Sequence, residues 1–122
     1  MTNSENMLVF VQKCLSNAGQ AYGLCCGLVA IAYAHRYSRS NSVADLENAI
    51  LYAEKSVGHG YEAIGLCHGL ASIVYATIYS ATRHAPDYDS AVAHADLAGL
   101  DGERFRGFSY GLRAIAYSIL PD

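Results

Sequence analysis

The sequence predicts an all-α protein made of three helical hairpins that form an arc of an α/α toroid. Two observations predict this class: a short element recurs every 42 residues, and each repeat contains one amphipathic and one almost wholly apolar helical stretch. A fixed period of about 20–50 residues is typical of stacked repeat units. The 122 residues are therefore expected to form a single domain, with hairpin units at about 1–38, 39–80 and 81–122.

The repeated element is a pair of glycines with three residues between them. It reads Gly-Leu-Cys-Cys-Gly from Gly23, Gly-Leu-Cys-His-Gly from Gly65 and Gly-Phe-Ser-Tyr-Gly from Gly107. An isoleucine and a tyrosine follow each copy in register, as Ile31 and Tyr33, Ile73 and Tyr75, and Ile115 and Tyr117. A HEAT-like solenoid has a similar period, and the Gly-x-x-x-Gly spacing favours the toroid over such a flatter stack.

The first helix of each unit is expected to be amphipathic and to lie in an outer layer. These helices are predicted at about 5–17, 43–57 and 88–98. The second of them has an apolar stripe at helical spacing, formed by Leu46, Ala49, Ile50, Ala53 and Val57. Ser42 and Pro86 are residues typical of helix starts, and they precede the second and third outer helices.

The second helix of each unit is expected to be apolar nearly all round and to lie in an inner layer, enclosed by protein. These helices are predicted at about 27–37, 69–80 and 111–119, from the second glycine of each repeated element onward. Polar loops at 38–41 and 80–86 lead from each inner helix to the next outer helix.

The composition indicates a folded protein without a nucleic-acid or membrane partner. Hydrophobic residues make up 52% of the chain and charged residues 16%, below the usual charged share of about 25%. The net charge is −3, and no stretch collects basic residues into a stripe that could follow phosphates. Residues 63–82 carry no charge and match the length of a membrane span, about 20 residues. They include several Gly, Ser and Thr residues, and no membrane span is expected there.

The chain begins with MTNSENMLVF, which lacks the basic start and apolar run of a secretion signal, so a cytoplasmic location is expected. In a reducing compartment the four cysteines are expected to be metal ligands, reactive thiols or small core residues rather than disulfides. Cys14 lies on the apolar stripe of the first outer helix and is expected to be a packing residue.

Two cysteines and a histidine occupy related positions in adjacent repeats. Cys25 and Cys67 have the same place in the repeated element, and His68 follows directly at the expected start of its helix. Neighbouring inner helices pack with axes about 8–10 Å apart, so the three side chains can face one site. Two thiolates and an imidazole are good zinc ligands and leave a fourth position open. Inert packing is the alternative, because cysteine is among the most often buried residue types.

The three copies of the repeated element resemble the last three hairpins of lanthionine synthetase C-like (LanC-like) proteins. The resemblance is carried by Gly-Leu-Cys-Cys-Gly-Leu, Gly-Leu-Cys-His-Gly-Leu-Ala and Gly-Phe-Ser-Tyr-Gly-Leu-Arg-Ala-Ile-Ala-Tyr, of which Cys-His-Gly is the most specific part. The family has an α/α toroid of seven hairpins and a zinc ion held by a Cys of one repeat and a Cys-His pair of the next. The resemblance implies Zn2+ as the cofactor, with Cys25, Cys67 and His68 as its ligands.

The resemblance also implies an activity, which is the closure of thioether rings in a dehydrated precursor peptide. In the family, zinc activates the thiol of a peptide cysteine, and this thiol adds to a dehydrated serine or threonine. Family members take a catalytic His and an Asp from earlier hairpins that have no counterpart in this sequence. The glycine that the family has three residues after Cys-His-Gly is Ser72 here, and the position after the first Cys, often Tyr in the family, is Cys26.

Three residues are further candidates for the reaction. His59 lies in a Gly-His-Gly loop before the second inner helix and is the candidate catalytic proton donor, with a solvated loop histidine as the alternative. Arg113 stands where the sister repeats have Val29 and Ala71, and it is a candidate for binding a substrate carbonyl or enolate, with a solvated residue at the exposed end of the arc as the alternative. Cys26 is a candidate substrate-binding residue, as a reactive thiol or an extra ligand, with small core filler as the alternative.

Three functions remain open at this point. The first is a zinc-dependent thioether cyclase; the second is a non-catalytic module with structural zinc that binds a peptide or a partner subunit; the third is a metal-free helical-repeat scaffold. An arc exposes apolar helix surface at both ends, and large apolar patches are uncommon on monomers. A homo-oligomer is therefore expected, with two copies completing a ring of six hairpins.

Overall fold

The computed structural model describes residues 1–99 and 103–122, and this part of the chain is helical without any strand, which confirms the all-α class. Six α-helices and two short 3-10 helices make up this part. They are α1 (Asn3–Ser16), η1 (Gly19–Ala21), α2 (Tyr22–Ser40), α3 (Val43–Gly58), η2 (Tyr61–Ala63), α4 (Ile64–Thr82), α5 (Ala85–Leu97) and α6 (Glu103–Ile119).

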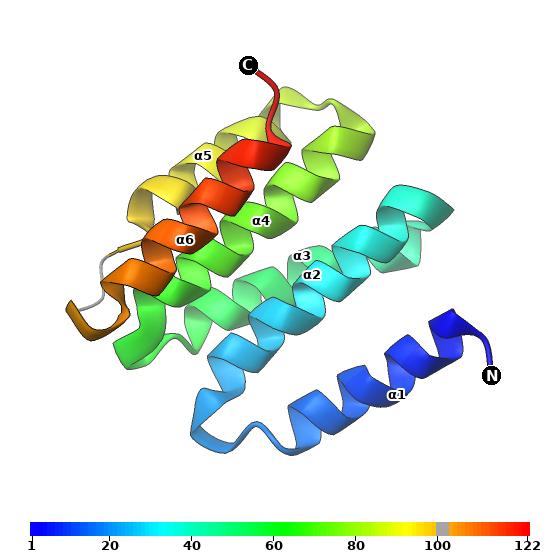
Figure 1. The fold of residues 1–122 in the computed structure, drawn as a ribbon. Helices are drawn as coiled ribbons and strands as arrows, with labels where there is room; N and C mark the ends of the chain where they lie inside the picture. Colours follow the sequence, from blue (N-terminus) through cyan, green and yellow to red (C-terminus); the bar gives the residue numbers. More distant parts are fainter. Residues whose placement is uncertain (100–102) are drawn as a thin grey trace.

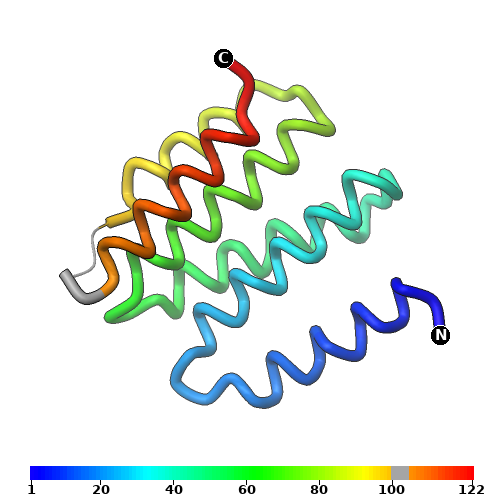
Figure 2. The backbone as a smooth tube through the Cα atoms, in the orientation of Figure 1, coloured from blue at the N-terminus to red at the C-terminus, as the bar shows by residue number. Residues whose placement is uncertain are grey.

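The helices lie in two layers. Helices α2, α4 and α6 form a row in which they run side by side and in the same direction (Figures 1 and 2). Helix α3 packs against α2 and α4, and α5 packs against α4 and α6, while α1 lies beside α2 at one end of the row. Helix α4 therefore has neighbours on both sides within the row and two more in the second layer.

Two apolar clusters hold the layers together. The first lies among α2, α3 and α4 and includes Val29, Ala53 and Ile78. The second lies among α4, α5 and α6 and includes Ala91 and Ala116. Alanines are frequent in both clusters, and their small side chains allow the helix axes to approach closely.

The uncharged stretch at residues 63–82 forms the central helix α4. In the described part of the chain, Tyr61–Thr82 is the one helix that is long and apolar enough to span a membrane, with a mean hydropathy of 1.4. The bent pair Asn3–Ser16 and Gly19–Ser40, at 116°, reaches the same threshold only if it is taken as one segment. Within α4, 72% of the apolar window is buried by the rest of the protein, as in a central core helix.

The outer helices begin and end close to the predicted residues, whereas the predicted starts of the inner helices are wrong. Helices α2, α4 and α6 begin at Tyr22, Ile64 and Glu103, five or more residues before the predicted positions. The reason is the role of the glycines: Gly23 lies inside α2, where a Cβ atom would be 2.5 Å from the backbone oxygen of His59. The glycines of the repeated element lie inside the helices and do not mark their ends, and Gly23, Gly27 and Gly69 allow a neighbouring segment to approach closely.

The same turn joins α2 to α3 and α4 to α5. Asn41 and Arg83 end the two inner helices in the left-handed conformation, with φ values of 56° and 57°. The hydroxyl of Ser40 donates to Asp45 (2.9 Å), and the hydroxyl 42 residues later, on Thr82, donates to the corresponding carboxylate (2.7 Å). Each hydroxyl also accepts a backbone N–H two residues further on.

Candidate functional site

The inner helices α2, α4 and α6 all begin at the same end of the row (Figure 1). The 3-10 helices η1 and η2 lead directly into α2 and α4. Cys25 and Cys67 are each the fourth residue of their helix, and His68 is the fifth residue of α4. All three expected metal ligands thus belong to the first turns of neighbouring helices.

Cys25 makes its side-chain contact with α1. Burial and a hydrogen bond with the thiol of Cys14 raise the pKa of Cys25 to about 11. Cys67, its counterpart on α4, is fully buried. The two cysteines therefore have different environments, one partly exposed beside α1 and the other inside the core.

His68 makes its contact with α5. Its Nδ1 atom lies 2.9 Å from Nδ1 of His94, and one of these nitrogens donates the hydrogen bond to the other. The ring of Tyr75 stacks on His94, with 5.5 Å between the centroids and 4° between the planes. Burial and the neighbouring His68 lower the pKa of His94, so the imidazole of His94 favours its neutral form. No sequence pattern assigns His94 a role, because its partner is recognised only once α4 and α5 are packed.

The expected zinc ligands do not form a metal site in this structure. Within residues 1–99 and 103–122, no three side chains of His, Cys, Asp or Glu are grouped closely enough to hold a metal ion. Consecutive residues of an α-helix diverge by about 100°, and Cys67 and His68 both lie within α4. The contacts with Cys14 and His94 further hold Cys25 towards α1 and His68 towards α5.

Cys26 is placed as a core residue. It is fully buried, and its thiol forms a hydrogen bond with the hydroxyl of Tyr22. Burial raises the pKa of Cys26, and the bond from Tyr22 acts in the opposite direction. Its surroundings in α2 match the alternative prediction of a small packing residue.

His59 lies in a groove at the end where the inner helices begin. The groove has a volume of about 720 Å³ and is lined by Gly19, Gln20, Ala21, Tyr22, Leu24, His59, Gly60, Tyr61, Glu62, Ala63 and Phe105. The exposed imidazole of His59 meets the ring of Tyr22 edge-on, with 5.1 Å between centroids. Tyr61, also in the groove, has a left-handed backbone with φ of 46°, which is unfavourable for a residue with a bulky side chain.

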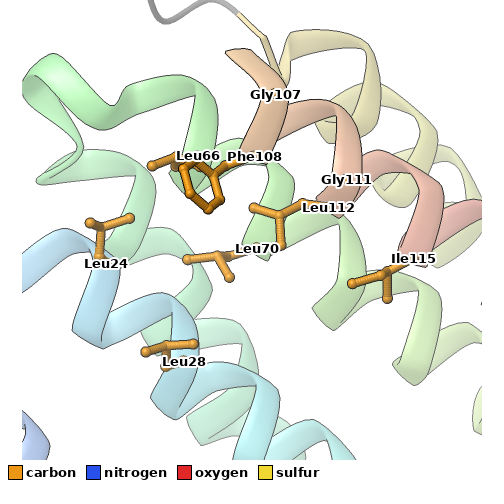
Figure 3. A pocket seen from close by; sticks show the side chains of 9 residues that line it. All are labelled: Leu24, Leu28, Leu66, Leu70, Gly107, Phe108, Gly111, Leu112 and Ile115. Atoms are coloured by element: carbon orange, nitrogen blue, oxygen red, sulfur yellow. The ribbon is translucent and has the colours of Figure 1, made fainter. Parts of the chain in front are cut away.

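A second groove runs across the exposed side of the inner row. It has a volume of about 840 Å³ and an apolar lining (Figure 3) of Leu24, Leu28, Leu66, Leu70, Gly107, Phe108, Gly111, Leu112 and Ile115. These residues come from equivalent positions of α2, α4 and α6, and α2 and α6 leave large parts of their apolar side chains exposed. The prediction that all inner helices are enclosed is therefore wrong for α2 and α6. The register of the leucines was the available signal for this surface.

Arg113 lines neither of the two grooves. Its Nη2 atom lies 3.8 Å from Oδ1 of Asp96, and its guanidinium lies over the ring of Tyr110, 5.9 Å from the centroid. The residue is partly buried, and its charge is directed towards α5.

In comparisons with known proteins, no family model, no curated protein and no solved structure matches the chain. The resemblance to LanC-like proteins therefore depends on the residues of the repeated element, and the geometry described above is the ground for proposing a function.

Proposed function

We propose that the protein is a LanC-like protein of the thioether-forming kind, in which three helical hairpins form an arc of an α/α toroid. The observation that carries the proposal is the recurrence of the same local structures at both ends of the inner helices α2 and α4, which contain the cysteine elements. The Ser40–Asp45 turn and the Thr82–Asp87 turn are 42 residues apart, and so are η1 and η2. Such recurrence supports units of a common repeat, and the Cys-His-Gly element on α4 supports this family over other helical repeats.

Zinc binding by Cys25, Cys67 and His68 belongs to the proposal and requires two side-chain contacts to be exchanged. Cys25 would leave Cys14, and His68 would leave His94. A neutral hydrogen bond contributes only about 0.5–1.5 kcal/mol net to stability. Zinc bound by cysteine and histidine in small domains contributes about 10–16 kcal/mol. The difference is large enough for a metal ion to draw these side chains out of their present contacts.

His59 is the proposed proton donor, and it lies in the groove at the end where the inner helices begin. When a thiol adds to a dehydrated residue, a sulfur–carbon bond forms at the β-carbon and the carbon–carbon double bond is lost. The α-carbon must then accept a proton, which an imidazolium at the surface of the groove can supply. His59 is exposed there between two tyrosines, so a peptide in the groove can reach its ring.

A non-catalytic binding module is the second candidate, and one observation favours it. The donors of the expected metal site lie on α2 and α4 but contact different elements: Cys25 contacts Cys14 of α1, His68 contacts His94 of α5, and Cys67 is fully buried. On this alternative the chain binds a peptide along its grooves without changing it, and the metal is structural or absent.

Zinc content measured on the purified protein tests the assignment of the metal ligands. We expect stoichiometric zinc in the wild type and its loss in Cys67→Ala, whereas Cys26→Ala keeps it. Cys26 is the matched control because it is also fully buried and loses the same atoms. A wild type without zinc, or a Cys67→Ala variant with full zinc, would refute the ligand assignment.

Turnover is measured with a dehydrated peptide that contains one cysteine, followed by alkylation of the remaining free thiols. Ring closure consumes the peptide thiol, so the cyclised product resists alkylation. We expect His59→Gln to slow this loss by about 10²–10⁴-fold, the usual contribution of a general acid. His84→Gln serves as the control, because His84 is also an exposed histidine and lies in the turn before α5. Binding of the peptide without loss of its thiol would support the non-catalytic module.

A further inference from the structure

A leucine on one inner helix packs against a glycine on the preceding inner helix, and this contact occurs twice. A Cβ atom at Gly27 of α2 would lie 2.5 Å from Cδ1 and 2.9 Å from Cβ of Leu70 on α4. A Cβ atom at Gly69 of α4 would lie 2.8 Å from Cβ of Leu112 on α6. The absence of a side chain at each glycine thus creates the space that the next leucine occupies.

The last glycine and the first leucine of this series have no packing partner of the same kind within the described chain. Gly111 on α6 follows Gly69 by one repeat, and a Cβ atom built there has no described atom within 4 Å. Leu28 on α2 precedes Leu70 by one repeat, and 55% of it is exposed. One edge of the row therefore presents the glycine half of the contact, and the other edge presents the leucine half.

Both edges are apolar around these residues. On α6, Phe108 and Ile115 lie three residues before and four residues after Gly111, on the same helix face, and are 71% and 48% exposed. Figure 3 shows Leu28 on α2 and Ile115 on α6 at the two sides of the apolar groove. Beside Leu28, Phe10 of α1 is also exposed. Surfaces of this kind are typical of protein–protein contacts.

We propose that two copies of this chain associate head to tail, with Leu28 of one copy packed against Gly111 of the other. The interface would repeat the Gly27–Leu70 and Gly69–Leu112 contacts between chains. This inference rests on the toroid arc proposed above, because the curvature of the row decides whether the contact closes. A head-to-tail interface gives a ring where the rotation closes and an open chain where it does not.

Two substitutions test the interface from its two sides. Leu28→Glu places a charge on the exposed leucine. Gly111→Ala adds a Cβ atom that meets open space within the chain but would collide with the incoming leucine. We expect the wild type to sediment with at least twice the chain mass of 13.1 kDa and each variant to associate at least ~10-fold more weakly. Leu51→Glu and Gly58→Ala are the matched controls, since both residues are exposed on α3, and we expect them to associate like the wild type.

Mixing the two variants tests the head-to-tail arrangement. The Leu28→Glu chain keeps its glycine edge, and the Gly111→Ala chain keeps its leucine edge. The mixture should form a species of twice the chain mass at a concentration where neither variant does so alone. A wild type that stays monomeric, variants that associate like the wild type, or a mixture that stays monomeric would each overturn the proposal.

The sedimentation runs are made with and without a metal chelator. Association that persists without zinc supports the interface even where the zinc proposal fails. Stoichiometric zinc in a monomeric wild type would instead support the metal site and overturn the interface. The two proposals therefore fail independently.

Discussion

Gly23 and Gly107 occupy the same position of the repeated element but have opposite surroundings. A Cβ atom at Gly23 would lie 2.5 Å from the carbonyl oxygen and 2.8 Å from the carbonyl carbon of His59, and backbone atoms cannot move aside as a side chain can. Gly23→Ala is therefore expected to lower the free energy of unfolding by about 1–3 kcal/mol. Gly107→Ala meets open space inside α6 and should raise it by about 0.5–1 kcal/mol.

Urea denaturation of the two alanine variants and the wild type measures both effects. The comparison is matched, because each variant adds one methyl group to the same position of an inner helix. Equal effects of the two substitutions would contradict the close approach of α2 to the loop after α3.

Asp45 forms an ion pair with Arg36, and its side chain is largely buried. The guanidinium of Arg36 donates two hydrogen bonds to Oδ1 at 3.0 and 2.7 Å, and Ser40 donates to Oδ2. Hydrogen bonds from Arg36 hold the pKa of Asp45 below its ordinary value of 3.8, and the bond from Ser40 adds to this effect. The carboxyl thus binds protons more readily in the unfolded chain, and its stabilising contribution is present above about pH 4 and is lost as the pH falls.

Asp45→Asn is therefore expected to lower the free energy of unfolding at pH 7 by about 1.5–3 kcal/mol, the usual range for hydrogen bonds to charged groups. The variant should also lose less stability than the wild type between pH 5 and pH 2. Asp87→Asn is the control, because Asp87 accepts the same hydroxyl bond but has Ile78 at the position of Arg36. Thermal unfolding followed across this pH range gives both quantities, and parallel curves for the two variants would exclude a special role of Arg36.

Individual helices could be predicted from the sequence to different extents. The outer helices follow an amphipathic pattern with clear start signals, so α3 begins at the predicted residue and ends one residue later than predicted. The inner helices carry glycines near their starts, and glycine is common both beyond helix ends and at close helix contacts. The choice between these roles depends on what lies opposite each glycine, such as Leu70 opposite Gly27, and this information is absent from a single helix sequence.

Helix α1 is expected to be the least stable element of the protein. None of its residues is fully buried, whereas α4 buries thirteen of its nineteen residues. Local opening costs least where few apolar contacts must be broken, so the amides of α1 should exchange with solvent deuterium well before those of α4. Hydrogen exchange followed by mass spectrometry measures this order. Exchange of α1 as slow as that of α4 would mean that further contacts cover α1 in solution.

The candidate site is harder to predict from the sequence than the helices are, because its contacts depend on how the whole molecule packs. The register of the repeats correctly indicated that Cys25 and Cys67 have equivalent helix positions, and it indicated the loop position of His59. The partners Cys14 and His94 come from other elements, and their contacts depend on side-chain rotamers that spacing does not determine. The apolar groove likewise becomes visible only when α2, α4 and α6 are assembled.

Association through the free edges would also change the stability of the whole molecule. A partner that binds only the folded chain stabilises it by about 2.7 kcal/mol at 100 times its Kd. For a chain of this size roughly 4 °C in Tm corresponds to each kcal/mol. We therefore expect the Tm of the wild type to rise by several degrees as the protein concentration is raised about a hundredfold across the Kd.

The two edge variants make this prediction specific to the interface. Gly111→Ala should have a higher Tm than the wild type at low concentration, because alanine favours the helix, yet its Tm should hardly change with concentration. Leu28→Glu should likewise show a flat dependence, while Leu51→Glu should follow the wild type. Differential scanning calorimetry over the concentration series measures each curve. A wild-type Tm that does not depend on concentration would leave the two apolar edges solvent-exposed in the native protein and would rule out the head-to-tail contact.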